Sequence, residues 1–304
     1  MSYAPRARDL TPTICAAVVA LTACVACGGS ERRADAASPH IVFYSARDGD
    51  PEIYTMKADG SEPMRMTFHS AADTDPDVSP DRERIVFTSN REGNEDIFVV
   101  GIGGGEPLNL TKTPSMEGWA RWSPDGRRIA FHSNRDDNLE IYTMNADGSA
   151  VTRVTQYAGD DKFPDWSPDG AQLLFLRDHD VWVANVDGSD PRALTNSPGL
   201  DQMAVQSPDG KLIAFMSLRE GYCAVFVMHA DGSDQKNVTP KDAADANDQW
   251  CSRMPSWSRD GRIYLTSKRP STNGDPEIFV MNADGTGITR LTTTPGLDGS
   301  PRSY

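Results

Sequence analysis

Long apolar runs are scarce in this 304-residue sequence. The stretch from Ile14 to Ala23 is apolar but too short to cross a bilayer, and Arg6 and Arg8 precede it. A short apolar core behind a basic start is typical of a signal peptide, which is removed from the mature protein. We therefore predict that residues 1–23 are an export leader and take no part in the fold.

Positive charge is also in short supply. The 30 lysine and arginine residues face 44 aspartate and glutamate residues, giving a formal net charge of -14. Such a chain repels nucleic acid and anionic membrane surfaces at long range. We expect no nucleic-acid partner. A basic protein patch or a cation complements this negative charge better.

Cysteine is sparse, and three of the five cysteines lie within the first 27 residues. Leu21-Thr22-Ala23-Cys24 resembles the bacterial lipobox, in which the cysteine carries a lipid after cleavage. Cys27 is an alternative acceptor, although a cysteine then stands where leucine is usual. We predict lipidation at Cys24, a flexible tether over residues 24–39, and a place in the periplasm or at the cell surface. The lipid anchor would be the chain's sole membrane contact.

Recognisable catalytic motifs are missing. The sequence has no Gly-x-Ser-x-Gly motif, and its five histidines are scattered without metal-ligand spacing. The Cys24 to Cys27 spacing has no partner pair, which disfavours zinc. We expect no catalytic residue, no metal site of this kind and no cofactor.

An internal repeat dominates residues 40–304. Ser-Pro-Asp-Gly or a near copy begins at Ser79, Ser123, Ser167, Ser207 and Ser258. The motif encodes a type I turn, because proline presets the second position and glycine tolerates the exit. An Asp-Gly pair follows in most copies, at Asp59, Asp147, Asp187, Asp231 and Asp284, and Gly103-Gly104 replaces it in one. Six units of about 44 residues result.

Each unit predicts four antiparallel strands, A to D. Strand A precedes the Ser-Pro-Asp-Gly turn, strand B follows it, and the Asp-Gly pair joins strands C and D. Such units indicate an all-β, six-bladed β-propeller, a ring that leaves no open edge. The first unit begins at strand B, with Ile41. Residues 298–304 resemble a strand A, so we predict that they close the ring, although Ser303 stands where Trp166 stands in another unit.

The repeat resembles the TolB-type propeller repeat, and residues 120–155 are its cleanest copy. The resemblance covers about residues 40–304 and implies the fold more strongly than any function. TolB is a periplasmic protein of the Tol-Pal system with a small α/β domain before its propeller. The present sequence has only a leader and a tether there, so a Tol-Pal role does not follow from the resemblance.

Acidic residues recur at two places in the repeat. One set opens strand A, and Ser252 is its exception: Asp73, Glu117, Asp161, Asp201 and Asp298. The second set opens strand C, and Ala224 is its exception: Glu52, Asp96, Glu140, Asp180 and Glu277. Both positions lie at one end of the ring. We predict an acidic channel mouth that binds a basic protein or a divalent cation. Alternatively, each acid caps a neighbouring turn.

Cys223 and Cys251 lie in neighbouring units, on loops that belong to one end of the ring. Export permits a disulfide, and we predict one between them. Two free thiols are the alternative.

Taken together, the residues and the resemblance predict a monomeric, non-enzymatic envelope lipoprotein that acts as a protein-interaction scaffold. A carbohydrate- or cation-binding propeller is the second possibility. The third is a cryptic polysaccharide-acting enzyme such as a lyase, because related propellers assemble such a site from several blades.

Overall fold

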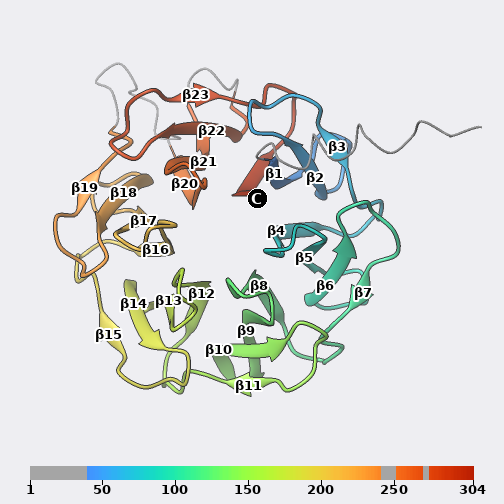
Figure 1. The fold of residues 1–304 in the computed structure, drawn as a ribbon, viewed down its shortest axis with the longest axis horizontal. Coiled ribbons are helices and arrows are strands. Elements are labelled where there is room, and N and C mark those ends of the chain that lie inside the picture. The colour runs from blue at the N-terminus through green and yellow to red at the C-terminus, as the bar shows by residue number, and fades with distance from the viewer. Residues whose placement is uncertain (1–39, 241–250, 270–273) are drawn as a thin grey trace, which may run out of the picture. The chain divides into compact units, whose positions relative to one another are not determined.

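The computed structural model describes residues 40–240, 251–269 and 274–304. These residues form twenty-four strands and no helix, arranged in six sheets of four strands. The sheets stand around a central axis like the blades of a propeller (Figure 1). The predicted six-bladed β-propeller is therefore confirmed.

Within each blade, the strands A to D run from the channel outward and pair antiparallel in that order. Blade 1 contains β24 (Asp298–Ser303), β1 (His40–Ser45), β2 (Glu52–Lys57) and β3 (Met64–Arg65). Blade 2 contains β4 (Asp73–Val78), β5 (Arg84–Ser89), β6 (Asp96–Gly101) and β7 (Leu108–Asn109). Blade 3 contains β8 (Glu117–Trp122), β9 (Arg128–Asp136), β10 (Asn138–Asn145) and β11 (Thr152–Arg153).

The other three blades repeat this plan. Blade 4 contains β12 (Asp161–Trp166), β13 (Gln172–Arg177), β14 (Asp180–Asn185) and β15 (Arg192–Ala193). Blade 5 contains β16 (Asp201–Gln206), β17 (Leu212–Ser217), β18 (Ala224–His229) and β19 (Lys236–Asn237). Blade 6 contains β20 (Cys251–Trp257), β21 (Arg262–Lys268), β22 (Glu277–Asn282) and β23 (Thr289–Arg290).

The ring closes through blade 1, as the sequence predicts. The C-terminal strand β24 pairs antiparallel with the N-terminal strand β1, with Ser45 opposite Asp298 and Ile41 opposite Ser303. His40 and Tyr304 extend the pairing at one end, because the backbone N–H of each donates to the carbonyl group of the other. Strands from the two ends of the described propeller thus complete one sheet, which leaves no open edge on the inner side of β1.

The core lies between blades. The strands B and C are buried on both faces, as in β5 and β9, where phenylalanine, isoleucine and valine side chains are fully enclosed. Each cluster of buried apolar residues joins two neighbouring sheets; one of them combines Phe87 of blade 2 with Tyr44 of blade 1. A single blade cannot bury both its faces, so stacking provides the core.

The Asp-Gly turn also packs blade against blade. Gly148 adopts a left-handed backbone, and a Cβ there would lie 2.7 Å from the carbonyl oxygen of Leu110 in the preceding blade. The equivalent glycines meet the same obstacle at 2.7 Å or less: Gly60, Gly188, Gly232 and Gly285. The pair thus marks both a hairpin and the close approach of two blades.

Candidate functional site

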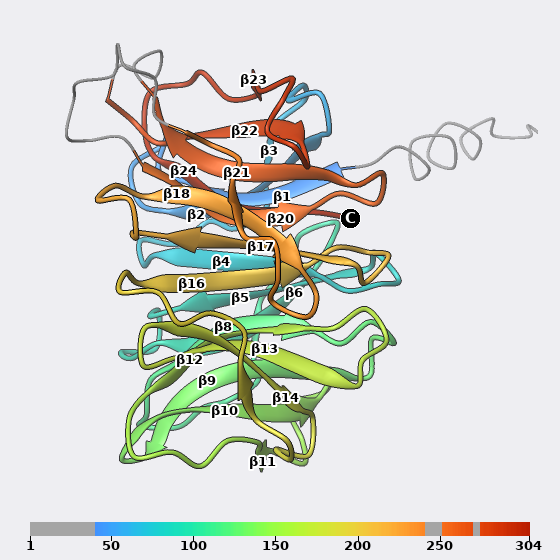
Figure 2. The same ribbon diagram turned by 90° about the vertical axis from the view of Figure 1, so that its left-hand side faces the viewer.

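The two ends of the ring carry different connections (Figure 2). Because the strands are antiparallel, the A–B and C–D turns share one end, which we call the turn face. The B–C and D–A connections share the other end, which we call the loop face. The sequence analysis placed the functional site at the loop face.

The acids that open strand A are buried in the structure. All five have no exposed surface, and each forms an ion pair with an arginine of its own blade, at 2.6 to 3.2 Å. The pairs are Asp298 with Arg47, Asp73 with Arg91, Glu117 with Arg135, Asp161 with Arg177 and Asp201 with Arg219. We call each pair a clasp.

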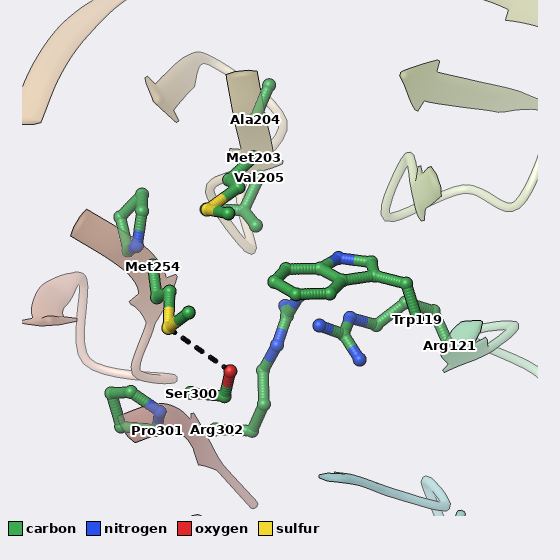
Figure 3. A pocket seen from close by; sticks show the side chains of 10 residues that line it. Trp119, Arg121, Met203, Ala204, Val205, Met254, Ser300, Pro301 and Arg302 are labelled. Carbon is green, nitrogen blue, oxygen red and sulfur yellow. Dashed lines mark hydrogen bonds between the residues drawn. The ribbon is translucent and has the colours of Figure 1, made fainter. Parts of the chain in front are cut away.

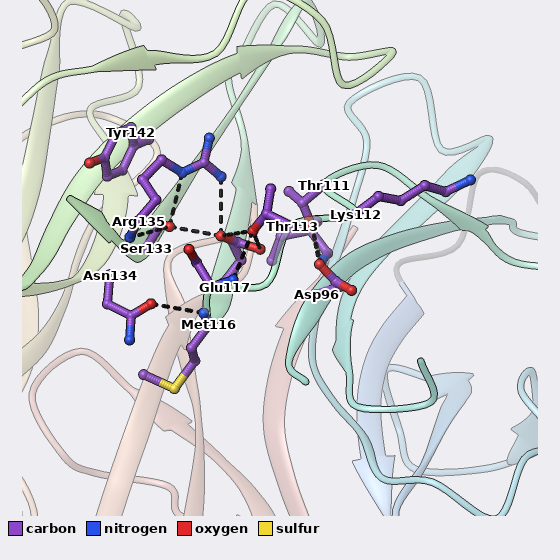
Figure 4. A network of polar contacts seen from close by, with 12 residues as sticks. Asp96, Thr111, Lys112, Thr113, Met116, Glu117, Ser133, Asn134, Arg135 and Tyr142 are labelled. Carbon is purple, nitrogen blue, oxygen red and sulfur yellow. Dashed lines mark hydrogen bonds and ion pairs between the residues drawn. The ribbon is translucent and has the colours of Figure 1, made fainter. Parts of the chain in front are cut away.

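The clasp of blade 3 shows how the acid is held (Figure 4). Glu117 accepts hydrogen bonds from the hydroxyls of Thr113 and Ser133 and from the Arg135 guanidinium. That guanidinium also lies over the ring of Tyr142, with its carbon 4.9 Å from the ring centre. Burial raises the pKa of Glu117, because the carboxylate has lost its water.

The acids that open strand C face inward too. The three glutamates among them are buried: Glu52, Glu140 and Glu277. Each accepts hydrogen bonds from an arginine of strand D and from the hydroxyl of a threonine just after that strand. Asp96 and Asp180 accept from Thr111 and Thr195 in the same way. These acids tie strand C to the end of strand D within one blade.

The expected acidic channel mouth is therefore wrong for these residues. Asp73, Glu117, Asp161, Asp201 and Asp298 point into their blades, where arginine neutralises each of them. They do not crowd around the channel, and they offer no open carboxylate to a cation. The ion pairs could have been predicted from the sequence. An arginine recurs two residues after the serine near the end of strand B, at Arg47, Arg91, Arg135 and Arg219.

Side chains from several blades converge between the innermost strands (Figure 3). Strand A bulges in every blade, and the bulging residue has a left-handed backbone: Asp75, Trp119, Phe163, Met203, Met254 and Ser300. Trp119, Met203, Met254 and the buried Arg121 line a cavity of about 10 Å³. Such a space holds about one water molecule.

Two arginines lie among these side chains. Arg302 of β24 reaches Asp165 of blade 4 at 2.8 Å, which ties the closing strand to the far side of the ring. Arg121 is buried and donates to backbone carbonyl groups, including that of Asp75. Burial, and then the nearby Arg302, lower the pKa of Arg121 to about 10. The centre is thus filled by apolar side chains and two arginines.

Exposed acids do stand on the loop face, one residue further along. An acid follows each clasp arginine directly, and all five are exposed: Asp48, Glu92, Asp136, Asp178 and Glu220. We call them the acid rim. Their carboxylates accept hydrogen bonds from tyrosine hydroxyl or asparagine amide groups, such as Tyr54 and Asn109. The sequence analysis missed this set, although the Arg-acid pairing recurs in five units.

Cys223 and Cys251 are joined by a disulfide, with their Cα atoms 4.4 Å apart. The bridge links blades 5 and 6. Ala224 replaces the strand C acid in blade 5, and Ser252 replaces the strand A acid in blade 6. The covalent link therefore lies where both repeated carboxylates are replaced.

Other expectations concern metal, membrane and leader. In the described parts of the chain, no group of three or more His, Cys, Asp or Glu side chains could hold a metal ion. None of the described residues belongs to a helix that could cross a membrane. Cys24, the leader and the tether fall outside the described residues.

Comparison with known proteins identifies the propeller type. A model of the TolB β-propeller domain matches residues 33–115 and 109–181. TolB from Acinetobacter baumannii superposes with a TM-score of 0.75 at 20% identity, over 88% of this chain and 66% of that one. This is a TolB-like β-propeller. The chain thus spans just under two thirds of that TolB.

Further solved structures share the fold of the TolB-like propeller. A TolB candidate from Agrobacterium tumefaciens matches at a TM-score of 0.69 and 19% identity, over 88% of this chain and 97% of that one. An oligogalacturonate lyase in complex with manganese matches at 0.58 and 15%, over 84% and 74%. No curated protein matches the chain. At these identities the likeness concerns the fold alone.

Proposed function

We propose that this TolB-like propeller is a non-enzymatic interaction scaffold of the bacterial cell envelope, anchored by lipid at Cys24, whose loop face binds a basic partner protein. The leader and the resemblance of Leu21-Thr22-Ala23-Cys24 to a lipobox support the location. The tether continues into His40, which stands at the turn-face end of β1. The loop face is then the end of the ring opposite the attachment point.

The acid rim carries this proposal. Five blades present an exposed carboxylate directly after an arginine that a buried acid holds in place. Four of these carboxylates stand three residues after the serine opposite the strand A acid, and in blade 4 Arg177 takes the place of that serine, so Asp178 stands closer to strand B. The clasps fix the roots of the B–C loops, so the rim is ordered before a partner arrives. Ordered side chains lose less entropy on binding. Asp48 and Asp136 also lie 3.9 and 3.5 Å from Arg65 and Arg153, but all five carboxylates stay exposed, so the set attracts a basic surface and speeds its encounter.

A pair of triple variants tests the role of the rim. The first is Asp48→Asn, Asp136→Asn and Asp178→Asn, which removes three rim charges and keeps an acceptor for each tyrosine. The control is Asp59→Asn, Asp147→Asn and Asp187→Asn, which changes the same charge in the same three blades on the turn face. Crosslinking in native membranes measures how much partner each variant captures.

We expect the rim variant to capture several-fold less partner than the wild type, and the control to capture as much. Capture by the wild type should weaken as salt rises, because exposed charges are screened beyond about 10 Å at 0.1 M ionic strength. Equal losses in both variants would show that net charge matters and the rim does not. Unchanged capture by the rim variant would contradict the proposal.

A further inference from the structure

The six repeats provide an internal comparison at the start of the D–A connection. One residue there stands just after a threonine and is exposed in every blade: Phe68, Lys112, Gln156, Asn196, Pro240 and Thr293. Five of these side chains are polar or proline. Phe68 is the exception, and it is 75% exposed. Single exposed apolar residues are common, so this departure needs support from its surroundings.

Those surroundings hold Phe68 outward. The residues on either side of it are both tied to Glu52, through the Thr67 hydroxyl and the His69 backbone N–H. The Arg65 side chain, which also pairs with Glu52, donates to the Thr67 carbonyl group. These contacts fix the backbone on both sides of Phe68. Its exposure is built into the loop.

Blade 3 shows that this loop needs no aromatic residue. There Glu140 accepts from the Thr155 hydroxyl and the Tyr157 backbone N–H, and Arg153 repeats the role of Arg65. The residue that this arrangement presents is Gln156. The same local structure therefore forms with a polar tip. Folding of the loop does not explain Phe68.

The neighbours of Phe68 have the composition of an interface. The Arg65 guanidinium lies over the Phe68 ring, 4.9 Å from its centre, and Met64 beside it is 58% exposed. Blades 3 to 6 carry polar residues in place of Met64, namely Thr152, Arg192, Lys236 and Thr289. Methionine, arginine and aromatic residues are enriched at the buried centres of protein interfaces. We call Met64, Arg65 and Phe68 the blade 1 edge.

Charge selects the kind of partner. Asp48 of the acid rim lies 3.9 Å from Arg65, and the exposed Glu62, two residues before Met64, pairs with Lys57 at 2.5 Å, so the edge itself is balanced in charge. The whole chain carries a formal net charge of -14, so a second copy of it or an anionic lipid surface is repelled at long range. A protein with basic groups around an apolar pocket complements both the acids and the ring.

We propose that the blade 1 edge is the anchor of the partner interface, where Phe68 inserts into an apolar pocket of the basic protein that the acid rim attracts. This inference rests on the proposed function. Anchors of this type are aromatic side chains near the centre of an interface, surrounded by contacts that exclude water. The exposed, preset position of Phe68 suits that role.

Photocrosslinking tests the location. A photoreactive phenylalanine analogue replaces Phe68 in one variant and Gln156 in another, within the full-length chain in native membranes. Because equivalent loops hold both residues, the two probes differ mainly in their blade. We expect one protein adduct from position 68 that is absent or much weaker at position 156. Adducts with a second copy, with lipid, or equally at both positions would overturn the proposal.

Binding of the adduct protein, once identified and purified, tests the role of the ring. Phe68→Gln gives the loop the residue that blade 3 already holds there, so the fold should be kept. We expect at least about tenfold weaker binding for Phe68→Gln, as for an interface anchor, and little change for Gln156→Ala. Equal binding by wild type and Phe68→Gln would overturn the proposal. If loss occurs only on neutralising the acid rim, the proposed function stands and the blade 1 edge is not its anchor.

Discussion

His132 illustrates how one buried residue couples the stability of the fold to pH. It is a buried side chain on β9, opposite Gly118 of β8, where a Cβ atom would lie 3.0 Å from the imidazole Nε2. Burial, and then the charges of Lys162 and Arg121, lower the pKa of His132 to about 3. The Phe163 backbone N–H points at Nδ1, at 3.4 Å. The folded protein therefore holds a neutral imidazole in the neutral pH range.

A pH-dependent loss of stability follows from this imidazole. In the unfolded chain histidine takes up a proton near pH 6.5, while the folded protein resists it. The His132 contribution is thus complete above about pH 6.5 and falls by about 1.4 kcal/mol per pH unit below it. Between pH 7 and pH 5, the free energy of unfolding of the wild type should fall about 2 kcal/mol more than that of His132→Asn. Parallel pH curves from urea unfolding would contradict this.

The direction of side chains is the part of the residue scale that the sequence could not predict. The repeated acids of strand A were visible, and so were the arginines after strand B. The direction of each carboxylate depends on how strand A pairs with strand B, where Asp161 stands opposite Arg177 and Asp73 opposite Ser89. The turn motifs do not encode this pairing.

At the scale of elements, each clasp joins the innermost strand to an arginine at the end of strand B or in the B–C loop of its own blade. Asp161 on β12 accepts two hydrogen bonds from Arg177, at 2.8 and 2.6 Å, and its side chain has no exposed surface. The Arg177 guanidinium also lies over the rings of Tyr157 and Trp182. Burial raises the pKa of Asp161.

Asp161→Asn should therefore act on stability. Removing one member of a buried ion pair leaves an uncompensated charge, at a cost of about 3 to 5 kcal/mol. The control is Asp190→Asn, an exposed turn residue with a left-handed backbone that asparagine tolerates, which should stay within about 0.5 kcal/mol. Urea unfolding with the disulfide intact measures both. A normal midpoint for Asp161→Asn would show that the clasp is dispensable.

The elements themselves were largely predictable. Turn motifs with a fixed spacing give the four strands of each blade, because proline and glycine impose their backbone angles locally. The D strands are reduced to two residues in every blade, from β3 to β23. Edge strands of that length offer little backbone to another chain, a tertiary feature that the local motif does not encode.

At the scale of the whole molecule, closure was predictable because the repeat is offset: strand A of the first unit is found in residues 298–304. The filled centre was not predictable, since it depends on side chains from four blades, among them Arg121 and Arg302. With the centre filled, the outer parts of the loop face remain for binding. The acid rim and the blade 1 edge both lie there.

The most direct test of this account compares two cysteine variants of blade 2 in intact cells. Glu95→Cys lies on the loop face and Glu106→Cys on the turn face, and both glutamates are exposed in the structure. Maleimide labelling of each is measured in the envelope and in the purified protein. The account predicts that position 95 is protected in the envelope and position 106 is labelled equally in both. Protection of position 106 alone, or of neither position, would contradict it.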